Sequence, residues 1–485
     1  MSKSAPNVRL YDAAKVTDFH RAPDLTSSAD YVVNRAGTRL RDYARWLDEN
    51  NDITIGILDV LVNNIVGTGI GIEPQVANRK GDPLEKVNQR IRYLFGEWCR
   101  KPEITGELSM GELQRLSCRT WLRDGEMFAE HIQGDVRANR RRTIPYCVRV
   151  LEADWLPFEK NSSKPRIIHG IQKDDDGVPV MYHFLEAIDD PVYAKYATDL
   201  KTRPVPAERV EHLKFSRRLN QTRGVSLLHG VINRLDNIKD IEESEQIACR
   251  VAAAFTAAIV RNPDMIQSSD PSFLTEDGDV NEKYRDRYFE MSPGLMIDTL
   301  LPGEDIKGIG LDRPNNNLIE FLGDQHRRLA SGTGTSYSSI SKRHDGSYSS
   351  QRQELVEQKP NNDRYRSQFI SDFLQPIYER FLFWCVESGQ LTLPRNASPD
   401  TLTRADYRSP GMPWIDPLKE MSADEKAVQN GFKSRHMVMR ERGYDPDIVD
   451  QQLQADMFQK AEQQNPPTPR ASAQAQPEED MNDED

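Results

Sequence analysis

The sequence predicts an α+β protein in which long helices accompany a part rich in short strands. Two stretches, about 226–261 and 350–388, carry apolar residues at three- and four-residue steps, which is typical of amphipathic helices. Residues 126–185 instead hold short apolar or alternating runs separated by turn residues, which is typical of strands. Hydrophobic residues make up only 37% of the 485, which indicates either extended or strongly solvated parts or a surface that is buried only on assembly.

The charge of the chain limits the classes of protein it fits. It has 64 Lys and Arg against 76 Asp and Glu, which gives a formal net charge of −12. A simple basic nucleic-acid-binding module does not fit this balance.

The cysteines and the apolar runs indicate the cellular setting. The five cysteines lie far apart, so neither a disulfide framework nor a CxxC metal or redox site is written in the sequence. The first residues lack the apolar core of a secretory signal, and no run approaches the ~18 apolar residues that span a bilayer. We therefore expect a soluble protein, made inside the cell, with no membrane partner.

The N-terminal part predicts an arm followed by helices. Residues 1–38 are polar and without sustained periodicity, which predicts an N-terminal arm. From Arg39 to Ile65 apolar residues recur at helical steps, and the glycines of 67–71 can end that helix and let a short strand begin. Two further helical blocks are expected at about 84–100 and 109–124.

The chemistry of the chain changes after Gly125. Four runs are predicted to be strands: 127–132, 146–151, 167–171 and 180–185. Residues 173–177, with three consecutive acids before Gly177, predict a turn between the last two of them. The three carboxylates are an alternative cation site, but such clusters are more often hairpin tips, and we favour the turn.

Long helices return in the second half. A helix is predicted over 226–261, and the Pro-, Gly- and Asp-rich residues 262–315 predict a compact inserted subdomain. A shorter helix, 316–331, leads into the Gly/Ser/Thr-rich residues 332–348, which have little apolar anchorage and predict a mobile loop.

The C-terminal part continues with helices and ends in a polar tail. Residues 349–464 include the helix at 350–388, with a large aromatic face and Pro376 as a candidate bend, and two amphipathic stretches at about 417–430 and 446–462. Residues 465–485 are acidic and of low complexity, so we expect them to be disordered.

Enzyme motifs are absent from the sequence. There is no phosphate-binding P-loop, no HExxH, no GxSxG and no kinase signature. The glycines of 67–71 follow a helix rather than a strand, so we interpret them as a structural turn and not a dinucleotide site. His169 and His183 are placed to face each other across a hairpin, and a structural role is favoured over a metal site. No catalytic residue, cofactor or metal is therefore predicted.

Basic residues gather locally in this acidic chain. They form four groups: Arg140 to Arg142, Arg217 and Arg218 with Arg223, Arg327 with Arg328, and Lys342 to His344. For any one group a solvated face or a salt bridge is the simpler interpretation. The last two groups flank the Gly/Ser/Thr-rich loop, where cations can contact phosphates without reading bases.

The order of these features resembles a known family, the lambda-type portal (head–tail connector) proteins of tailed bacteriophages. Each matching stretch is weak alone, but together they keep a consistent order over about 40–460. The stretches are 63–70 with Pro74-Gln75, Arg119 to Glu126, Val150 to Asp154, Arg223 to Ser226, Gly303 to Asp305, Tyr348 to Arg352 and Asp416 to Glu420.

The resemblance implies the portal fold, with long stem helices, a β-containing wing, an inserted clip and a helical crown, assembled as a dodecameric ring around a channel. By order and spacing the regions would be a wing at 39–225, a stem helix at 226–261, a clip at 262–315, a second stem helix at 316–331, a tunnel loop at 332–348 and wing or crown at 349–464.

The resemblance also implies a function. Such a protein is a passive conduit at one capsid vertex of the virion, assembled in the host cytoplasm. The terminase large subunit drives double-stranded DNA through it, the DNA later leaves the same way, and neck proteins dock on it; major capsid and scaffold proteins are the other implied partners. Acidic walls would repel phosphates so that DNA slides, with weak contact from a few basic side chains.

The expected channel residues come from the two basic groups and the loop between them. They are Arg327, Arg328, Thr335, Ser336, Lys342, Arg343 and His344. Two other classes stay open at this point: a metal-dependent DNA-processing enzyme that uses acidic clusters, and a structural capsid or scaffold component without a channel.

Overall fold

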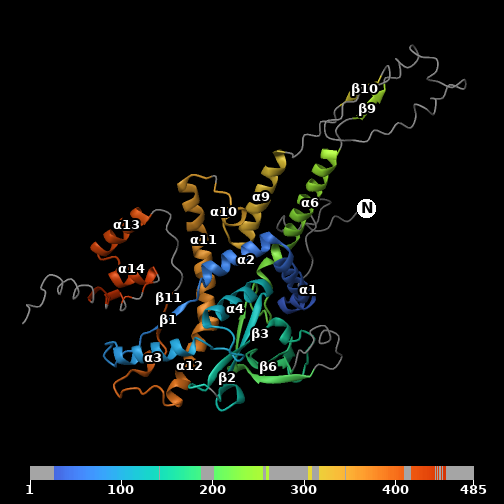
Figure 1. Ribbon diagram of the computed structural model, residues 1–485. Helices are drawn as coiled ribbons and strands as arrows, with labels where there is room; N and C mark the ends of the chain where they lie inside the picture. The colour runs from blue at the N-terminus through green and yellow to red at the C-terminus, as the bar shows by residue number, and fades with distance from the viewer. Residues whose placement is uncertain are drawn as a thin grey trace, which may run out of the picture. The chain divides into compact units, whose positions relative to one another are not determined.

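The computed structural model describes residues 27–140, 142–186, 201–254, 258–261, 304–307, 316–344, 346–408 and most of 417–454. Helices and strands both contribute, as the sequence predicts for an α+β protein (Figure 1). The chain forms two compact units. One comprises Met1–Arg45, Leu58–Leu227 and Gly346–Asp485, and the other comprises Trp46–Ile57 and Leu228–Asp345.

The first helix begins earlier than predicted. Helix α1 spans Ala29–Asn50, so the expected arm of residues 1–38 is wrong for its last ten residues. Long-range contacts hold this start: the carboxylate of Asp30 accepts hydrogen bonds from the amide and hydroxyl of Thr222, both at 2.7 Å. Asn51 then separates α1 from α2 (Asp52–Ile65) and caps α2, because its Oδ1 accepts the amide of Thr54 at 2.9 Å.

The next elements follow the prediction. Strand β1 (Gly71–Pro74) begins after the glycines and pairs antiparallel with β11 (Ala405–Arg408). Helices α3 (Glu85–Trp98) and α4 (Met110–Asp124) lie where the apolar periodicity places them. Ser109 caps α4 in a capping box: its side chain accepts the amide of Glu112, and the Glu112 carboxylate accepts the amide of Ser109.

Replacing Ser109 with alanine is expected to lower the free energy of unfolding by about 1 kcal/mol, because the amide of Glu112 in the first turn of α4 loses its side-chain acceptor. Chemical denaturation of the purified chain measures the change. Ser109→Thr keeps the hydroxyl and is the matched control, expected close to the unsubstituted protein. Equal stability of the alanine and threonine variants would show that the cap contributes nothing.

Two antiparallel sheets form the β-rich part. One has the order β3-β2-β8 and the other β4-β5-β6-β7. The strands are β2 (Glu126–Gln133), β3 (Tyr146–Glu152), β4 (Ile167–Ile168), β5 (Ile171–Lys173), β6 (Pro179–Leu185), β7 (Thr202–Pro206) and β8 (Val210–Lys214). A cluster that includes Phe128, Tyr182 and Phe184 packs the two sheets together. The strand predicted at 167–171 is two strands, and β7 and β8 were not predicted.

The acidic run at the β5–β6 hairpin is a turn, as predicted. The amide of Asp174 donates to the carbonyl of Val178 at 3.0 Å, and the amide of Val178 donates to the Asp174 carboxylate at 2.7 Å. Gly177 takes a left-handed φ of 88°, which favours glycine. No group of three or more metal-binding side chains occurs here or elsewhere in the described chain.

The second unit contains α6 (Ile232–Ala254) and α9 (Asn316–Thr333), which lie side by side in Figure 1. The helix predicted at 226–261 is therefore too long. Leu227–Gly230 is a 3₁₀ turn, and Ala258–Arg261 is strand β9, paired antiparallel with β10 (Glu304–Lys307). The β-branched Ile259 and Val260 favour this pairing over a helix. Apart from β10, residues 262–315 lie outside the described chain.

The long C-terminal helix is confirmed with one irregularity. Helix α11 (Tyr348–Phe369) continues through a π-helical turn at Ile370–Leu374 into α12 (Gln375–Glu387). Pro376, the candidate bend, stands directly after this π-helical turn, where the regular i to i−4 hydrogen bonding is already interrupted. The predicted aromatic face is buried, and Phe381 packs edge-on against Phe95 of α3 with ring centres 5.1 Å apart.

The remaining elements are short. Helix α13 (Pro417–Gln429) is confirmed, whereas α14 (Arg435–Glu441) was not predicted. Short 3₁₀ helices span Arg137–Asn139, Ala153–Trp155, Ala207–Arg209 and Pro399–Thr401. Most of the stretch predicted at 446–462, and all of 465–485, lie outside the described residues. Among those described, no helix has the length and apolar character needed to cross a membrane.

Candidate functional site

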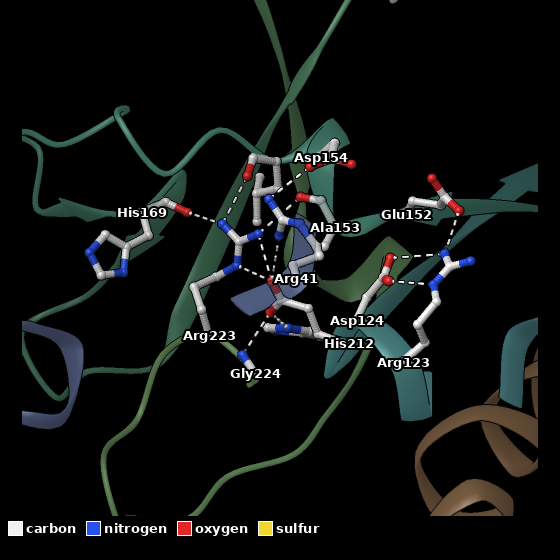
Figure 2. Close-up of polar contacts among 12 residues, drawn as sticks. Arg41, Arg123, Asp124, Glu152, Ala153, Asp154, His169, His212, Arg223 and Gly224 are labelled. Carbon is white, nitrogen blue, oxygen red and sulfur yellow. Dashed lines mark hydrogen bonds and ion pairs between the residues drawn. The ribbon is translucent and has the colours of Figure 1, made fainter. Parts of the chain in front are cut away.

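A network of buried and half-buried charges joins α1, α4 and the β3-β2-β8 sheet in the first unit. It is balanced, with four arginines and four carboxylates, and most of it is drawn in Figure 2. The members are Arg41, Arg45, Arg123 and Arg223 with Asp124, Glu126, Glu152 and Asp154.

Arg223 lies at the centre of this network and has no exposed surface. Its Nε donates to Oε1 of Glu126 at 2.8 Å, and its Nη2 forms an ion pair with the same oxygen at 2.7 Å. The two terminal nitrogens donate to the carbonyls of Leu156, His169 and Ala153, at 2.9–3.0 Å. These four hydrogen bonds and the ion pair compensate the charge of Arg223 although it is buried.

Glu126 is equally well partnered. Its second oxygen accepts the amide of Gly224 at 2.8 Å and lies 3.0 Å from Nε2 of His212. Burial alone would raise the pKa of this carboxyl, but Arg223 and the hydrogen bond from His212 hold it well below its usual range. Burial also lowers the pKa of His212 to about 4, against the pull of Glu126, so the imidazole is neutral at pH 7.

The outer half of the network ties α1 to the ends of α4 and β3. Asp124, with no exposed side-chain surface, accepts from Arg123 Nε at 2.7 Å and pairs with Arg45 at 2.5 Å. Arg123 also reaches Glu152 at 3.1 Å, as Figure 2 shows. Asp154 pairs with Arg41 at 2.7 Å and also with Arg45. Arg41 and Arg45 are one helical turn apart, so both face the sheets.

Two glycines let the chain cross itself beside this network. Gly125 ends α4 with a left-handed φ of 88°, and a Cβ there would lie 2.1 Å from the carbonyl carbon of Val225. A Cβ on Gly224 would lie 2.1 Å from the carbonyl oxygen of Gly125. Only glycine fits at either position, so the stretches around 125 and 224 are in direct backbone contact.

The network of four arginines and four carboxylates has a structural role and no catalytic character. Every charge in it has an opposite partner, and it contains no nucleophile beside a base. The sequence grouped Arg223 with Arg217 and Arg218 as basic residues and missed its role, because Glu126 is 97 positions away.

The expected channel residues all lie in the second unit, around the short helix α10 (Tyr337–Ser341). Arg327 and Arg328 are on α9: the guanidinium of Arg327 stacks over the ring of Tyr337 at 4.9 Å, and Arg328 pairs with Asp324 at 2.8 Å. Lys342 ends α10 in the left-handed conformation, and Arg343 and His344 follow it, both exposed.

The loop between the two basic groups is folded, not irregular. The expectation of an unanchored loop from 332 is wrong, because α9 continues to Thr333 and α10 starts at Tyr337. Thr335 and Ser336 are buried. Thr335 pairs with the hydroxyl of Thr333 at 2.9 Å, and Ser336 caps α10 through the amide of Ser339. These hydroxyl groups replace the apolar anchorage that the sequence lacks.

Comparison with known families identifies the chain. The family described as phage portal protein, lambda family, matches residues 19–366. The chain belongs to this family. Among relatives of this portal protein, the probable portal protein of Halomonas phage phiHAP-1 is 24% identical over 444 residues, which cover 88% of this chain and 82% of the relative. Portal protein B of Escherichia phage lambda is 23% identical over 334 residues, 63% of this chain and 61% of that protein.

The similarity to solved structures is weaker than the similarity to these sequence relatives. The neck of an empty GTA particle overlaps with a TM-score of 0.47 at 12% identity, over 87% of this chain and 95% of that one. A score below 0.5 does not establish a shared fold, so the assignment depends on the sequence family. The portal family is structural, so the prediction of a non-enzymatic protein is confirmed and the DNA-processing enzyme is ruled out.

The other basic groups of this portal protein have local structural partners. Arg142 donates to the carbonyl of Glu103 at 2.5 Å, and Arg218 donates to the carbonyl of Ser27 at 2.9 Å. His169 contacts the side-chain amide of Asn34 at 2.8 Å. These contacts agree with the structural interpretations that the sequence favoured for the histidine and the isolated basic groups.

Proposed function

We propose that this portal protein assembles as a dodecameric ring at one capsid vertex of a phage-like particle, with double-stranded DNA passing through its channel. The terminase large subunit would dock on the clip at 262–315 and drive packaging, and neck proteins would dock there later. Capsid and scaffold proteins would surround the ring. Family membership supports this function, and the character of α6 and α9 supports assembly.

The main support for assembly is the exposed apolar surface of the two proposed stem helices, α6 and α9. Ile247 of α6 and Ile319 and Phe321 of α9 are 53%, 54% and 46% exposed. Large apolar side chains on neighbouring helices are costly to leave in water, and contact with other copies would cover them. The low hydrophobic content of the single chain is then explained by burial that is completed on assembly.

Negative-stain images of the assembled protein test this proposal. A portal must appear as a ring with a central hole, whereas a scaffold component without a channel need not. Assemblies that lack a hole under conditions where the protein is folded would contradict the proposal.

The region around α10 is proposed to face the DNA. Reversing the charge of Arg327, Arg328, Lys342 and Arg343 together is expected to reduce the yield of DNA-filled particles while rings still form, because weak phosphate contacts become repulsive. A packaging assay with particles counted by DNA content measures this. The matched control reverses four exposed cations of the first unit, Arg79, Lys80, Lys86 and Arg395, and should package normally. Normal packaging by the first variant would contradict the placement.

A further inference from the structure

A cavity of about 300 Å³ in the first unit is lined by β8 with the loop after it, by α11 and by the π-helical turn. Its charged lining is mostly positive: Lys214, Arg217 and Arg364 stand against a single carboxylate, Asp372. His212 also lines it but is neutral, because burial lowers its pKa to about 4. In a chain with a net charge of −12, a concave site of this sign is unexpected.

None of the three cations has an ion-pair partner within the part of the chain that the structure describes. Lys214 donates only to main-chain carbonyls, those of Gln221 at 2.9 Å and Thr222 at 3.1 Å. Arg364 donates to the amide oxygen of Asn361 at 3.1 Å and stacks over Tyr365. An anionic group that entered the cavity would therefore meet three cations without an ion-pair partner and one carboxylate, Asp372.

The edge of the cavity is a preorganised loop with an apolar tip. Residues 216–220 are exposed, and Leu219 is 93% exposed. The buried side chain of Gln221 holds this loop: its Oε1 accepts the amide of Arg217 at 3.0 Å, and its Nε2 donates to the carbonyl of Phe215 at 3.3 Å. An exposed leucine on a fixed loop loses little entropy when a partner covers it.

The β5–β6 hairpin of the same chain has the complementary character. Asp175 and Asp176 at its tip are exposed and pair with no described cation. Val178 and Val180 beside them are 56% and 41% exposed. The hydrogen bonds of Asp174 fix the turn, so the two carboxylates project from a narrow and ordered element.

We infer that the hairpin tip of one copy inserts Asp175 and Asp176 into the cavity of the next copy, while Val178 and Val180 cover Leu219. The two surfaces differ and lie on one chain, so the contact is head-to-tail, the type of contact that closes into rings. A narrow hairpin can enter a cavity that a DNA duplex cannot. The inference rests on the proposed ring and names the residues of one contact between its subunits.

Charge reversal on each side separates this contact from a simple loss of folding. The tip variant is Asp175→Lys with Asp176→Lys, and the cavity variant is Arg217→Glu with Arg364→Glu; all four side chains are exposed. Each variant alone, in the full chain, is expected to lower the ring fraction at least about tenfold, because like charges face each other at every contact. Mass photometry of the purified protein measures the ring fraction.

The decisive experiment mixes the tip variant with the cavity variant. In an alternating ring each reversed tip meets a reversed cavity and each native tip meets a native cavity, so the mixture should recover rings although neither variant forms them alone. The control Arg79→Glu with Arg395→Glu should assemble normally. Rings from either variant alone, or no recovery in the mixture, would overturn the contact while the unsubstituted rings still support the proposed function. Absence of rings from the unsubstituted chain would contradict both.

Discussion

Replacing Arg223 with methionine is expected to lower the free energy of unfolding by about 3–5 kcal/mol. Methionine fills much of the same volume, but it leaves Glu126 ionised at 1% exposure without its main partner. It also removes the donors to the carbonyls of Leu156 and His169, and one of the two donors to the carbonyl of Ala153, which keeps the amide of Leu156 at 3.2 Å. An unpaired buried charge and two carbonyls that lose their donor act in the same direction.

Denaturant unfolding followed by tryptophan fluorescence measures this loss. Trp121 is a suitable reporter, because it is buried in the same unit and stacks on Phe215 with ring centres 4.3 Å apart. Arg218→Met is the matched control, since Arg218 is exposed, and it should change stability by no more than about 0.5 kcal/mol.

The double variant Arg223→Met with Glu126→Gln identifies the cause. It removes both charges, so it should recover part of the loss if the stranded carboxylate is responsible. A loss below about 1 kcal/mol for Arg223→Met, or no recovery in the double variant, would contradict the role given to this ion pair.

Local patterns predicted most of the elements but not their limits. Apolar periodicity is a property of neighbouring residues, and α3, α4 and α12 lie where it places them. The early start of α1 depends instead on Asp30 bonding to Thr222, 192 positions away. Strand β9 likewise depends on pairing with Glu304–Lys307. This partner lies too far along the chain to be recognised from the residues next to Ile259.

The charge network around Arg223 was only partly predictable, because its members also lie far apart in the sequence. The stretches around Glu126 and Arg223 both carried the resemblance to portal proteins, yet nothing in one sequence says that they touch. Their glycines were the available signal, because Gly125 and Gly224 flank the two charged residues and mark a close backbone approach. The hydroxyls that order residues 333–339 look in sequence like those of a loop without structure.

Acid is expected to destabilise the first unit through His212. Its pKa falls from an ordinary 6.5 to about 4 because burial disfavours the imidazolium, and Lys214 and Arg223 act in the same direction while Glu126 opposes them. Between these values the unfolded chain binds a proton that the folded chain does not, so stability is full above pH 6.5 and falls as the pH drops. The loss from this one group between pH 7 and pH 5 is about 2 kcal/mol.

His212→Gln tests this directly, since glutamine keeps an N–H that can reach Glu126 but does not titrate. As the pH is lowered from 7 to 6 and 5, the free energy of unfolding of this variant should decline less steeply than that of the unsubstituted protein. Burial also lowers the pKa values of His169, which is buried, and of His183, which is half-buried, and their contribution to the slope remains in the variant. Glu126 contributes only below its ordinary pKa of 4.5, so it does not enter this window. The control His436→Gln removes a half-exposed histidine paired with Asp450. A slope that His212→Gln leaves unchanged would mean that this imidazole is already protonated in the folded protein.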